Sequence, residues 1–91
     1  MKSLPRQVLP YKRTPDFTLS SLPTGLQQSH NTKAGVWGKI VILAGSVRYR
    51  ILEPELEELL LTPDRYGIIE PTIKHEVIPD DRARFYVEFY R

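Results

Sequence analysis

The two histidines are the residues of this 91-residue chain whose type and setting best suit binding chemistry. His30 leads into a polar turn and the phrase Gly35-Val-Trp-Gly38, and His75 follows the pair Glu70-Pro71. In a small β-barrel, two such turn-and-strand phrases can direct both imidazoles at one central point. Two imidazoles and a carboxylate can hold zinc, iron(II) or manganese and leave coordination positions for water or a substrate.

His75 alternates with Ile73 and Val77, so it shares their core-facing side if these residues form a strand. An unpaired imidazole in the core costs about 1–3 kcal/mol, so His75 requires a metal, a backbone carbonyl or a carboxylate as its partner. A core histidine paired with the protein itself is an equally good interpretation of His75 alone. For His30 alone, a surface loop histidine is the better interpretation.

Two acids lie close to His75 in the sequence. Glu70 stands at a bend before Pro71, whereas Glu76 adjoins His75 and points to the opposite face of a regular strand. This parity favours Glu70 as a third metal ligand beside His30 and His75. A solvated surface acid is the competing interpretation of both residues, and it is the better one for Glu76.

Composition narrows the classes of function. The chain has no cysteine, which excludes disulfides, thiolate ligands and a cysteine nucleophile. The net charge of +2 comes from interspersed acids and bases, so we expect no nucleic-acid partner. No apolar stretch approaches the roughly 18 residues that a membrane span needs, and no signal core is present, so we expect a cytoplasmic protein with no membrane partner. Sequence motifs of phosphate-binding loops, serine hydrolases and zincins are also missing.

Eight prolines and short apolar runs predict many short strands rather than long helices. We expect one all-β domain over residues 1–91. In it, the proline-rich residues 1–24 form an extended segment of edge strands or loops that packs on the barrel. The predicted strands cover residues 26–30, 37–44, 47–51, 57–61, 68–69, 73–78 and 84–90.

Three of these elements carry more specific expectations. Residues 39–43 are almost continuously apolar, which is typical of a strand covered on both faces, and Gly45-Ser46 after them predicts a hairpin turn. Residues 47–51 alternate strictly, which places Arg48 and Arg50 on a solvated face. Residues 53–61 have the composition of a helix, but the flanking prolines and the short length favour a strand over residues 57–61.

The spacing of the two histidine phrases resembles the motifs of the cupin superfamily. Gly25 and His30 keep the opening spacing of the first motif, and Gly45 supplies its closing turn. Thr32 stands where that motif has a second histidine, and the motif's acid is missing near residues 36–37. Pro71 and His75 match the second motif, one residue closer together than usual.

A more specific resemblance covers nearly the whole chain. The sequence resembles the small YeaR/TehB-like cupin family, whose domain occurs alone or ahead of a methyltransferase in some tellurite-resistance proteins. Because the chain ends at the family's last strand, we expect the stand-alone form without methyltransferase activity. The resemblance is carried by Leu9-Pro-Tyr-Lys-Arg-Thr-Pro15, Ser21-Leu-Pro23, His30-Asn-Thr-Lys-Ala-Gly-Val-Trp-Gly38, Glu70-Pro71, His75-Glu-Val77 and Arg84-Phe-Tyr-Val-Glu-Phe89.

The resemblance implies a double-stranded β-helix, a jelly-roll barrel of two antiparallel sheets. It also implies a metal site near the barrel mouth, with His30, Glu70 and His75 at the family's ligand positions. Our first hypothesis is a cupin that binds zinc, iron or manganese and an unidentified small ligand in a tellurite, oxyanion or nitrosative stress response. Whether such a protein is an enzyme stays open, because this fold serves many functions.

Two other hypotheses remain. The chain can be a non-enzymatic binding or interaction module, since Thr32 and the missing acid weaken the ligand set. Alternatively, both histidines can be packing groups only. Exposed strand edges further predict a homodimer, formed through residues 84–90 or through the amino-terminal segment.

Overall fold

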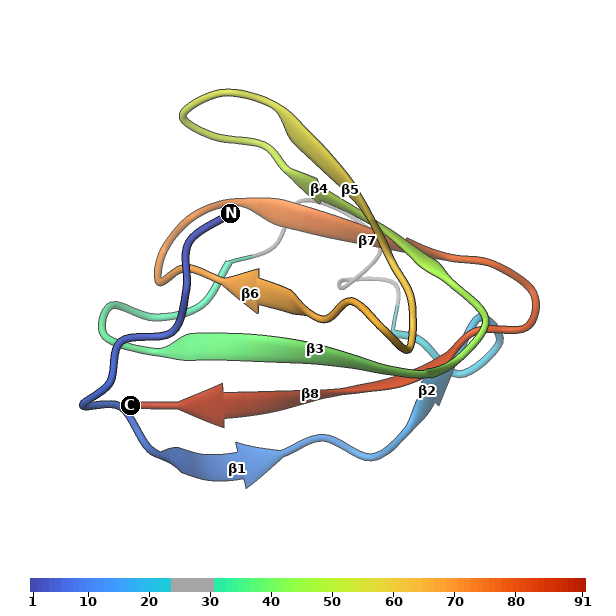
Figure 1. Ribbon diagram of the computed structural model, residues 1–91, viewed down its shortest axis with the longest axis horizontal. Helices are drawn as coiled ribbons and strands as arrows, with labels where there is room; N and C mark the ends of the chain where they lie inside the picture. The colour runs from blue at the N-terminus through green and yellow to red at the C-terminus, as the bar shows by residue number, and fades with distance from the viewer. Residues whose placement is uncertain (24–30) are drawn as a thin grey trace.

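Alternation of apolar and polar residues along short strands produces two antiparallel sheets that face each other (Figure 1). The structure is a computed structural model and describes residues 1–23 and 31–91. The strand predicted over residues 26–30, and His30 with it, lies outside the described residues. The described residues contain strands and turns but no helix, so none of their elements is a helix able to cross a membrane.

The larger sheet has the strand order β1-β8-β3-β6, with β2 also paired to β8. The smaller sheet has the order β5-β4-β7. The strands of the larger sheet are β1 (Pro10–Arg13), β2 (Phe17–Thr18), β3 (Trp37–Ala44), β6 (Gly67–Ile69) and β8 (Arg84–Tyr90). Those of the smaller sheet are β4 (Val47–Ile51), β5 (Glu57–Leu61) and β7 (His75–Pro79).

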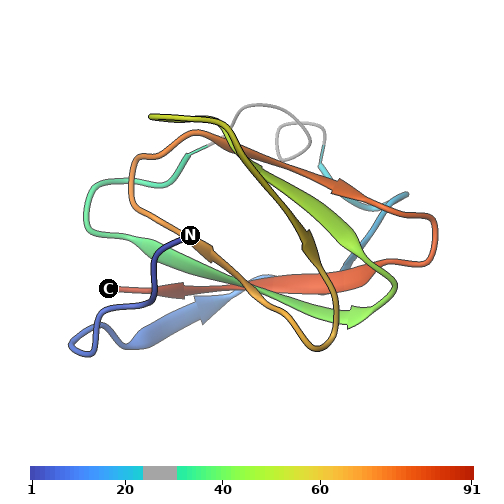
Figure 2. The ribbon, with the colours of Figure 1, turned by 45° about the horizontal axis from the view of Figure 1, so that its top comes forward.

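From β3 onward the chain passes repeatedly from one sheet to the other, and only β4 and β5 form a hairpin of consecutive strands (Figure 2). The predicted hairpin turn at Gly45-Ser46 is therefore wrong, because β3 and β4 belong to different sheets. Gly45 has φ +65° and packs against the turn before β8, where an added Cβ would lie 2.6 Å from the backbone nitrogen of Ala83. The turn is tight because it joins two packed layers.

The core lies between the sheets and is built from inward-facing residues of both. On β3, Ile40 and Ile42 are buried while Leu43 is exposed, so the expectation of a strand covered on both faces is wrong. On the outer face of this strand, Trp37 and Val41 are half-buried and only Leu43 is exposed. The buried core cluster comprises Phe17, Leu22, Ile40, Ile42, Val47, Tyr49, Leu61, Ile69, Val77, Ala83, Phe85 and Val87.

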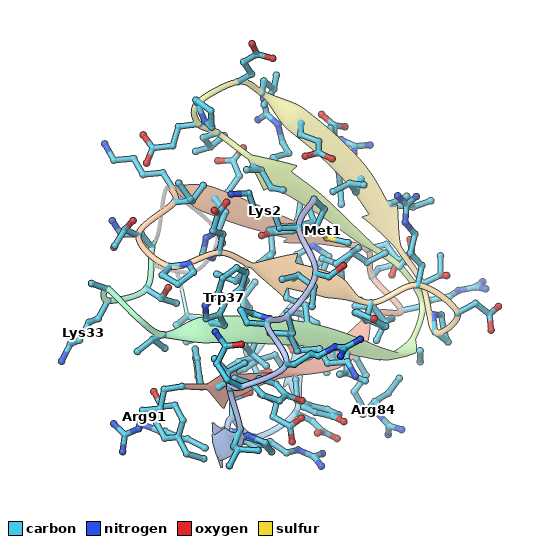
Figure 3. All side chains as sticks on the ribbon, turned by 60° about the vertical axis from the view of Figure 1, so that its left-hand side comes forward. Met1, Lys2, Lys33, Trp37, Arg84 and Arg91 are labelled. Carbon is cyan, nitrogen blue, oxygen red and sulfur yellow. The ribbon has the colours of Figure 1, made fainter. Side chains whose placement is uncertain are left out.

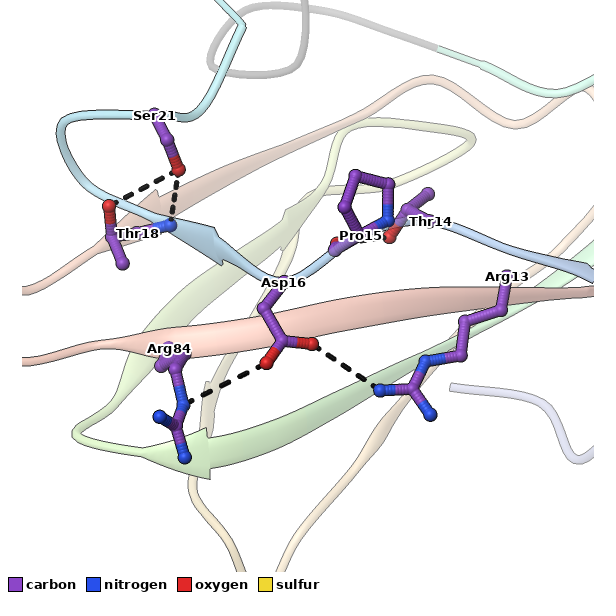
Figure 4. Close-up of polar contacts among 7 residues, drawn as sticks. All are labelled: Arg13, Thr14, Pro15, Asp16, Thr18, Ser21 and Arg84. Carbon is purple, nitrogen blue, oxygen red and sulfur yellow. Dashed lines mark hydrogen bonds and ion pairs between the residues drawn. The ribbon is translucent and has the colours of Figure 1, made fainter.

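The amino-terminal segment is attached to β8 through β1 and β2, which confirms the prediction of edge strands there. Asp16 pairs with Arg13 at 3.3 Å and reaches Arg84 of β8 at 3.9 Å (Figure 4). Thr14 makes two hydrogen bonds to Val87 of β8. Its backbone N–H donates to the carbonyl oxygen of Val87, and its Oγ1 accepts the backbone N–H of Val87, both at 2.9 Å.

This arrangement changes the expectation about strand edges. β8 is paired with β3 on one side and with β1 and β2 on the other, so residues 84–90 do not form an exposed edge. Among the described strands, the outermost ones are β1, β2 and β6 in the larger sheet and β5 and β7 in the smaller one. Homodimerisation stays a prediction, and these outermost strands are its candidate edges.

The outer face of the smaller sheet carries a charged row, as the alternation of residues 47–51 predicts. Arg50 lies between Glu58 of β5 and Glu76 of β7, its register partners in the two neighbouring strands. Its guanidinium pairs with both carboxylates, and Arg48 also reaches Glu58 at 3.2 Å. Opposite charges directly across a sheet stabilise the pairing of the strands.

Candidate functional site

His75 opens β7 and points into the space between the sheets, as its alternation with Ile73 and Val77 predicts. The side chain is only 4% exposed. Its Nδ1 lies 3.2 Å from the carbonyl oxygen of Ile73. The ring meets the ring of Tyr49 edge to face, with 5.8 Å between the centroids and 70° between the planes. Backbone and aromatic contacts thus fix the orientation of the imidazole.

A cavity of about 40 Å³ adjoins His75 and is almost entirely apolar. A water molecule needs roughly 10–15 Å³ of such volume, so the cavity holds only a few water-sized groups. Two threonine hydroxyls complete its lining. The Oγ1 of Thr32 donates to the carbonyl oxygen of Val36 at 2.7 Å, and the Oγ1 of Thr14 donates to that of Pro15 at 2.9 Å. The lining residues are Thr14, Thr32, Ile40, Ile69, His75, Val77, Phe85, Val87 and Phe89.

Glu70 follows β6 at the predicted bend and faces a second cavity. Its carboxylate pairs with Lys2 Nζ at 2.8 Å. The bend continues through Thr72, which has a left-handed φ of 65° that is unusual for a residue other than glycine. The N–H of Thr72 donates to the carbonyl oxygen of Thr32 at 3.1 Å, which ties this bend to the loop before β3.

The second cavity has a volume of about 410 Å³ and lies between β6 and the β4–β5 hairpin. Glu70 lines this cavity, whereas His75 lines the smaller one, so the structure places these two predicted ligands in different cavities. The third predicted ligand, His30, lies outside the described residues. Within residues 1–23 and 31–91, no group of three or more His, Cys, Asp or Glu side chains is arranged to hold a metal ion.

Glu76 is on the outer face, paired with Arg50, which confirms that it points away from His75. The outward direction is therefore as predicted, but Glu76 is a half-buried, ion-paired acid rather than a solvated one.

Sequence reasoning missed the role of Tyr49. Its alternation with Val47 identifies it as inward-facing, but its partner is remote: the hydroxyl donates to the carbonyl oxygen of Ile68 at 2.9 Å. Burial raises the pKa of Tyr49, and the carboxylates of Glu57 and Glu70 raise it further. Tyr49 therefore remains a neutral donor; it lines the larger cavity, and its ring contacts His75, which lines the smaller one.

The amino-terminal residues are the other feature that the sequence did not reveal. Met1 and Lys2 line the larger cavity and lie beside β6 (Figure 3). The Met1 amino group contacts both carboxylate oxygens of Glu57, at 2.8 and 3.0 Å, and the Ile68 N–H donates to Met1 Sδ at 3.0 Å.

Comparison with known proteins relates this fold to one family. A family model described as a TehB-like domain matches residues 12–87. The chain is 33% identical over 81 residues to "Probable S-adenosyl-L-methionine-dependent methyltransferase TehB" of two Haemophilus influenzae strains, 10810 and Rd. That match covers 82% of this chain but 28% of the relatives, so the chain spans less than a third of their length.

Solved structures agree with this comparison. The crystal structure of TehB from Haemophilus influenzae matches with a TM-score of 0.85 and 31% identity, over 93% of this chain and 32% of that chain. A crystal structure of a protein from Escherichia coli K12 matches with a TM-score of 0.90 over 100% of this chain and 97% of that chain. Its identity is 20%, so this second likeness concerns the fold alone.

Proposed function

The chain belongs to the TehB-like domain family, and from that premise we propose that it is a small cupin-type domain that binds a divalent metal ion beside His75. The ion would be zinc, iron(II) or manganese, and a small ligand would complete its coordination. Two facing antiparallel sheets, with most consecutive strands in opposite layers, are the architecture that such a double-stranded β-helix requires.

The observation that carries this proposal is the placement of the His75 imidazole. When Nδ1 bears the proton and donates to the Ile73 carbonyl oxygen, Nε2 keeps the lone pair that a metal requires. Metal-binding histidines commonly donate their other ring N–H to a backbone carbonyl in this way, which holds the tautomer and the ring orientation. The apolar lining of the adjoining cavity would strengthen interactions between an ion and its ligands.

His75 would supply one ligand, and we propose His30 as the second on the strength of the family resemblance. Glu70 fits less well as a third ligand, because its carboxylate pairs with Lys2 and faces the larger cavity. Thr32, at the motif position of a second histidine, donates its hydroxyl to Val36. A bound ion would supply Lewis-acid chemistry toward an oxygen-donating ligand.

The biological setting is proposed from the family alone. We propose a role in the response to tellurite, other oxyanions or nitrosative stress. The Haemophilus influenzae relatives are named as probable methyltransferases, but this chain spans 28% of their length, and we propose no methyl transfer by residues 1–91.

Metal stoichiometry tests the proposal. Purified protein is saturated with zinc, iron(II) or manganese in separate samples, desalted and examined by elemental analysis. We expect close to one equivalent in the wild type and a loss of binding in His75→Ala and His30→Ala. Val77→Ala removes a buried side chain from the same face of β7 and should keep its metal. Less than about a tenth of an equivalent in the folded wild type would refute the proposal.

A second candidate function is a metal-independent binding module. It is favoured by the absence of a three-ligand group among the described residues and by the apolar lining around His75. This candidate predicts that chelator-treated protein binds a small apolar probe such as xenon beside His75, whether or not metal is added. Competition between added metal and the probe would favour the first proposal.

A further inference from the structure

The larger cavity is distinct from the one beside His75 and has a different chemistry. Its floor is apolar and includes Tyr49, Ile51 and Ile73. Its rim carries carboxylates from three segments of the chain: Glu53 and Glu55 lie on the loop after β4, Glu57 begins β5, and Glu70 follows β6. A cavity of about 410 Å³ with this lining suits an aliphatic molecule that carries positive charge.

The chain already places cationic groups at this rim. Residues 1–3, here called the strap, run beside β6 toward the β4–β5 hairpin (Figure 3). The Met1 amino group contacts Glu57 at 2.8 Å, and Lys2 Nζ contacts Glu70 at 2.8 Å. Between them, the Met1 side chain is only 18% exposed and its Sδ accepts the Ile68 N–H. Two ammonium groups therefore occupy the rim, joined through the Met1–Lys2 peptide bond and the methylene groups of the Lys2 side chain.

We propose that the larger cavity is a binding site for an aliphatic diammonium ligand, and that the strap is an internal competitor that must move aside. Glu57 and Glu70 would bind the two ammonium groups of the ligand, as they bind the strap, and the apolar floor would contact the carbon chain. The fields of both carboxylates reach the interior, because both contribute to the raised pKa of Tyr49. This proposal is independent of metal binding at His75.

The strap is suited to reversible displacement. The Lys2 side chain is 70% exposed, and ion pairs exposed to this degree are weak and screened by salt. The thioether of Met1 is a weak acceptor for the Ile68 N–H. A ligand that can bind only when the strap has moved aside binds in proportion to the fraction of molecules in that open state. Loosening the strap should therefore raise the apparent affinity of the ligand.

Calorimetric titration of the chelator-treated full chain with 1,6-diaminohexane tests the proposal. We expect Lys2→Gln, and separately a chain lacking residues 1–3, to bind at least about fivefold more tightly than the wild type. Glu57→Gln and Glu70→Gln, each combined with Lys2→Gln, should weaken binding about tenfold relative to Lys2→Gln alone, because each removes a charged hydrogen-bond acceptor. Glu58→Gln combined with Lys2→Gln is the matched control, because Glu58 is next to Glu57 on β5 but faces outward. This double variant should bind the diamine as tightly as Lys2→Gln alone.

The neutral analogue 1,6-hexanediol separates charge recognition from apolar burial and should bind at least about tenfold more weakly than the diamine. Equal affinity for the two compounds would overturn the proposal. So would unchanged affinity in both strap variants, or an equal loss in Glu57→Gln and Glu58→Gln. His75→Ala should leave diamine binding intact, so failure of the metal proposal and failure of this one are separate outcomes.

Discussion

The Nδ1 atom of His75 lies 3.2 Å from the carbonyl oxygen of Ile73, two residues earlier in the same chain. The contact uses the backbone of the loop that enters β7, so the imidazole orientation depends on how that loop is held. The Thr72 N–H, next to Ile73, donates to the Thr32 carbonyl oxygen and so joins this loop to the one before β3. Two loops distant in sequence therefore position one buried side chain.

Tyr49→Phe should destabilise the protein by about 1–3 kcal/mol, because it leaves the buried carbonyl oxygen of Ile68 without its donor. The aromatic ring beside His75 is kept, so packing changes little. Urea denaturation measures the change. Tyr66→Phe, at a residue 52% exposed, is the control and should shift the free energy of unfolding by less than about 0.5 kcal/mol. Equal effects of the two substitutions would contradict this account.

Gly45→Ala and Gly35→Ala separate backbone strain from steric conflict. Both glycines have positive φ, at +65° and +79°, so alanine costs about 1–2 kcal/mol at either position. At Gly45 the added Cβ would also lie 2.6 Å from Asp80 Oδ1 and from the Ala83 backbone nitrogen, while at Gly35 it meets nothing within 4 Å. We expect Gly45→Ala to cost at least about 2 kcal/mol more in thermal or urea denaturation. Similar losses at both sites would show that the sheets relax around the turn.

Asp80 should make stability depend on pH at the acidic end. Desolvation acts to raise the pKa of Asp80, but hydrogen bonds from Ser46, Arg82 and Ala83 outweigh it and lower the pKa. A carboxyl whose folded pKa is lowered stabilises the fold above its unfolded pKa of about 3.9, and this contribution is lost as pH falls through the folded value. The urea midpoint of the wild type should therefore fall more steeply below about pH 4 than that of Asp80→Asn. Asp81→Asn controls for the change in net charge, and identical pH profiles for wild type and Asp80→Asn would contradict the prediction.

Local alternation predicted most of the strands correctly. It placed Val47, Tyr49 and Phe85 inward, and it favoured a strand over residues 57–61, where composition favoured a helix. In a strand, each choice of face depends only on neighbours two residues apart, so the sequence carries this information directly. The opposed directions of His75 and Glu76 follow from the same rule.

Pairing between distant segments could not be predicted in this way. Gly45-Ser46 has the sequence of a hairpin turn, yet the partners of β3 and β4 are set by packing between layers. Glu70 was a reasonable ligand for a metal near His75, but its pairing with Lys2 depends on a contact across 68 positions of the chain (70 − 2). Long-range contacts of this kind leave no periodic signal in the sequence.

The central claim is that His75 binds a metal ion, and anomalous X-ray scattering from metal-loaded crystals tests it most directly. Crystals of the zinc-loaded protein measured at the zinc absorption edge should give one strong anomalous peak about 2.0–2.1 Å from Nε2 of His75. The same peak should be absent from His75→Ala crystals and present in Val77→Ala crystals. No peak beside His75 at saturating zinc, or a peak that persists in His75→Ala, would contradict the claim.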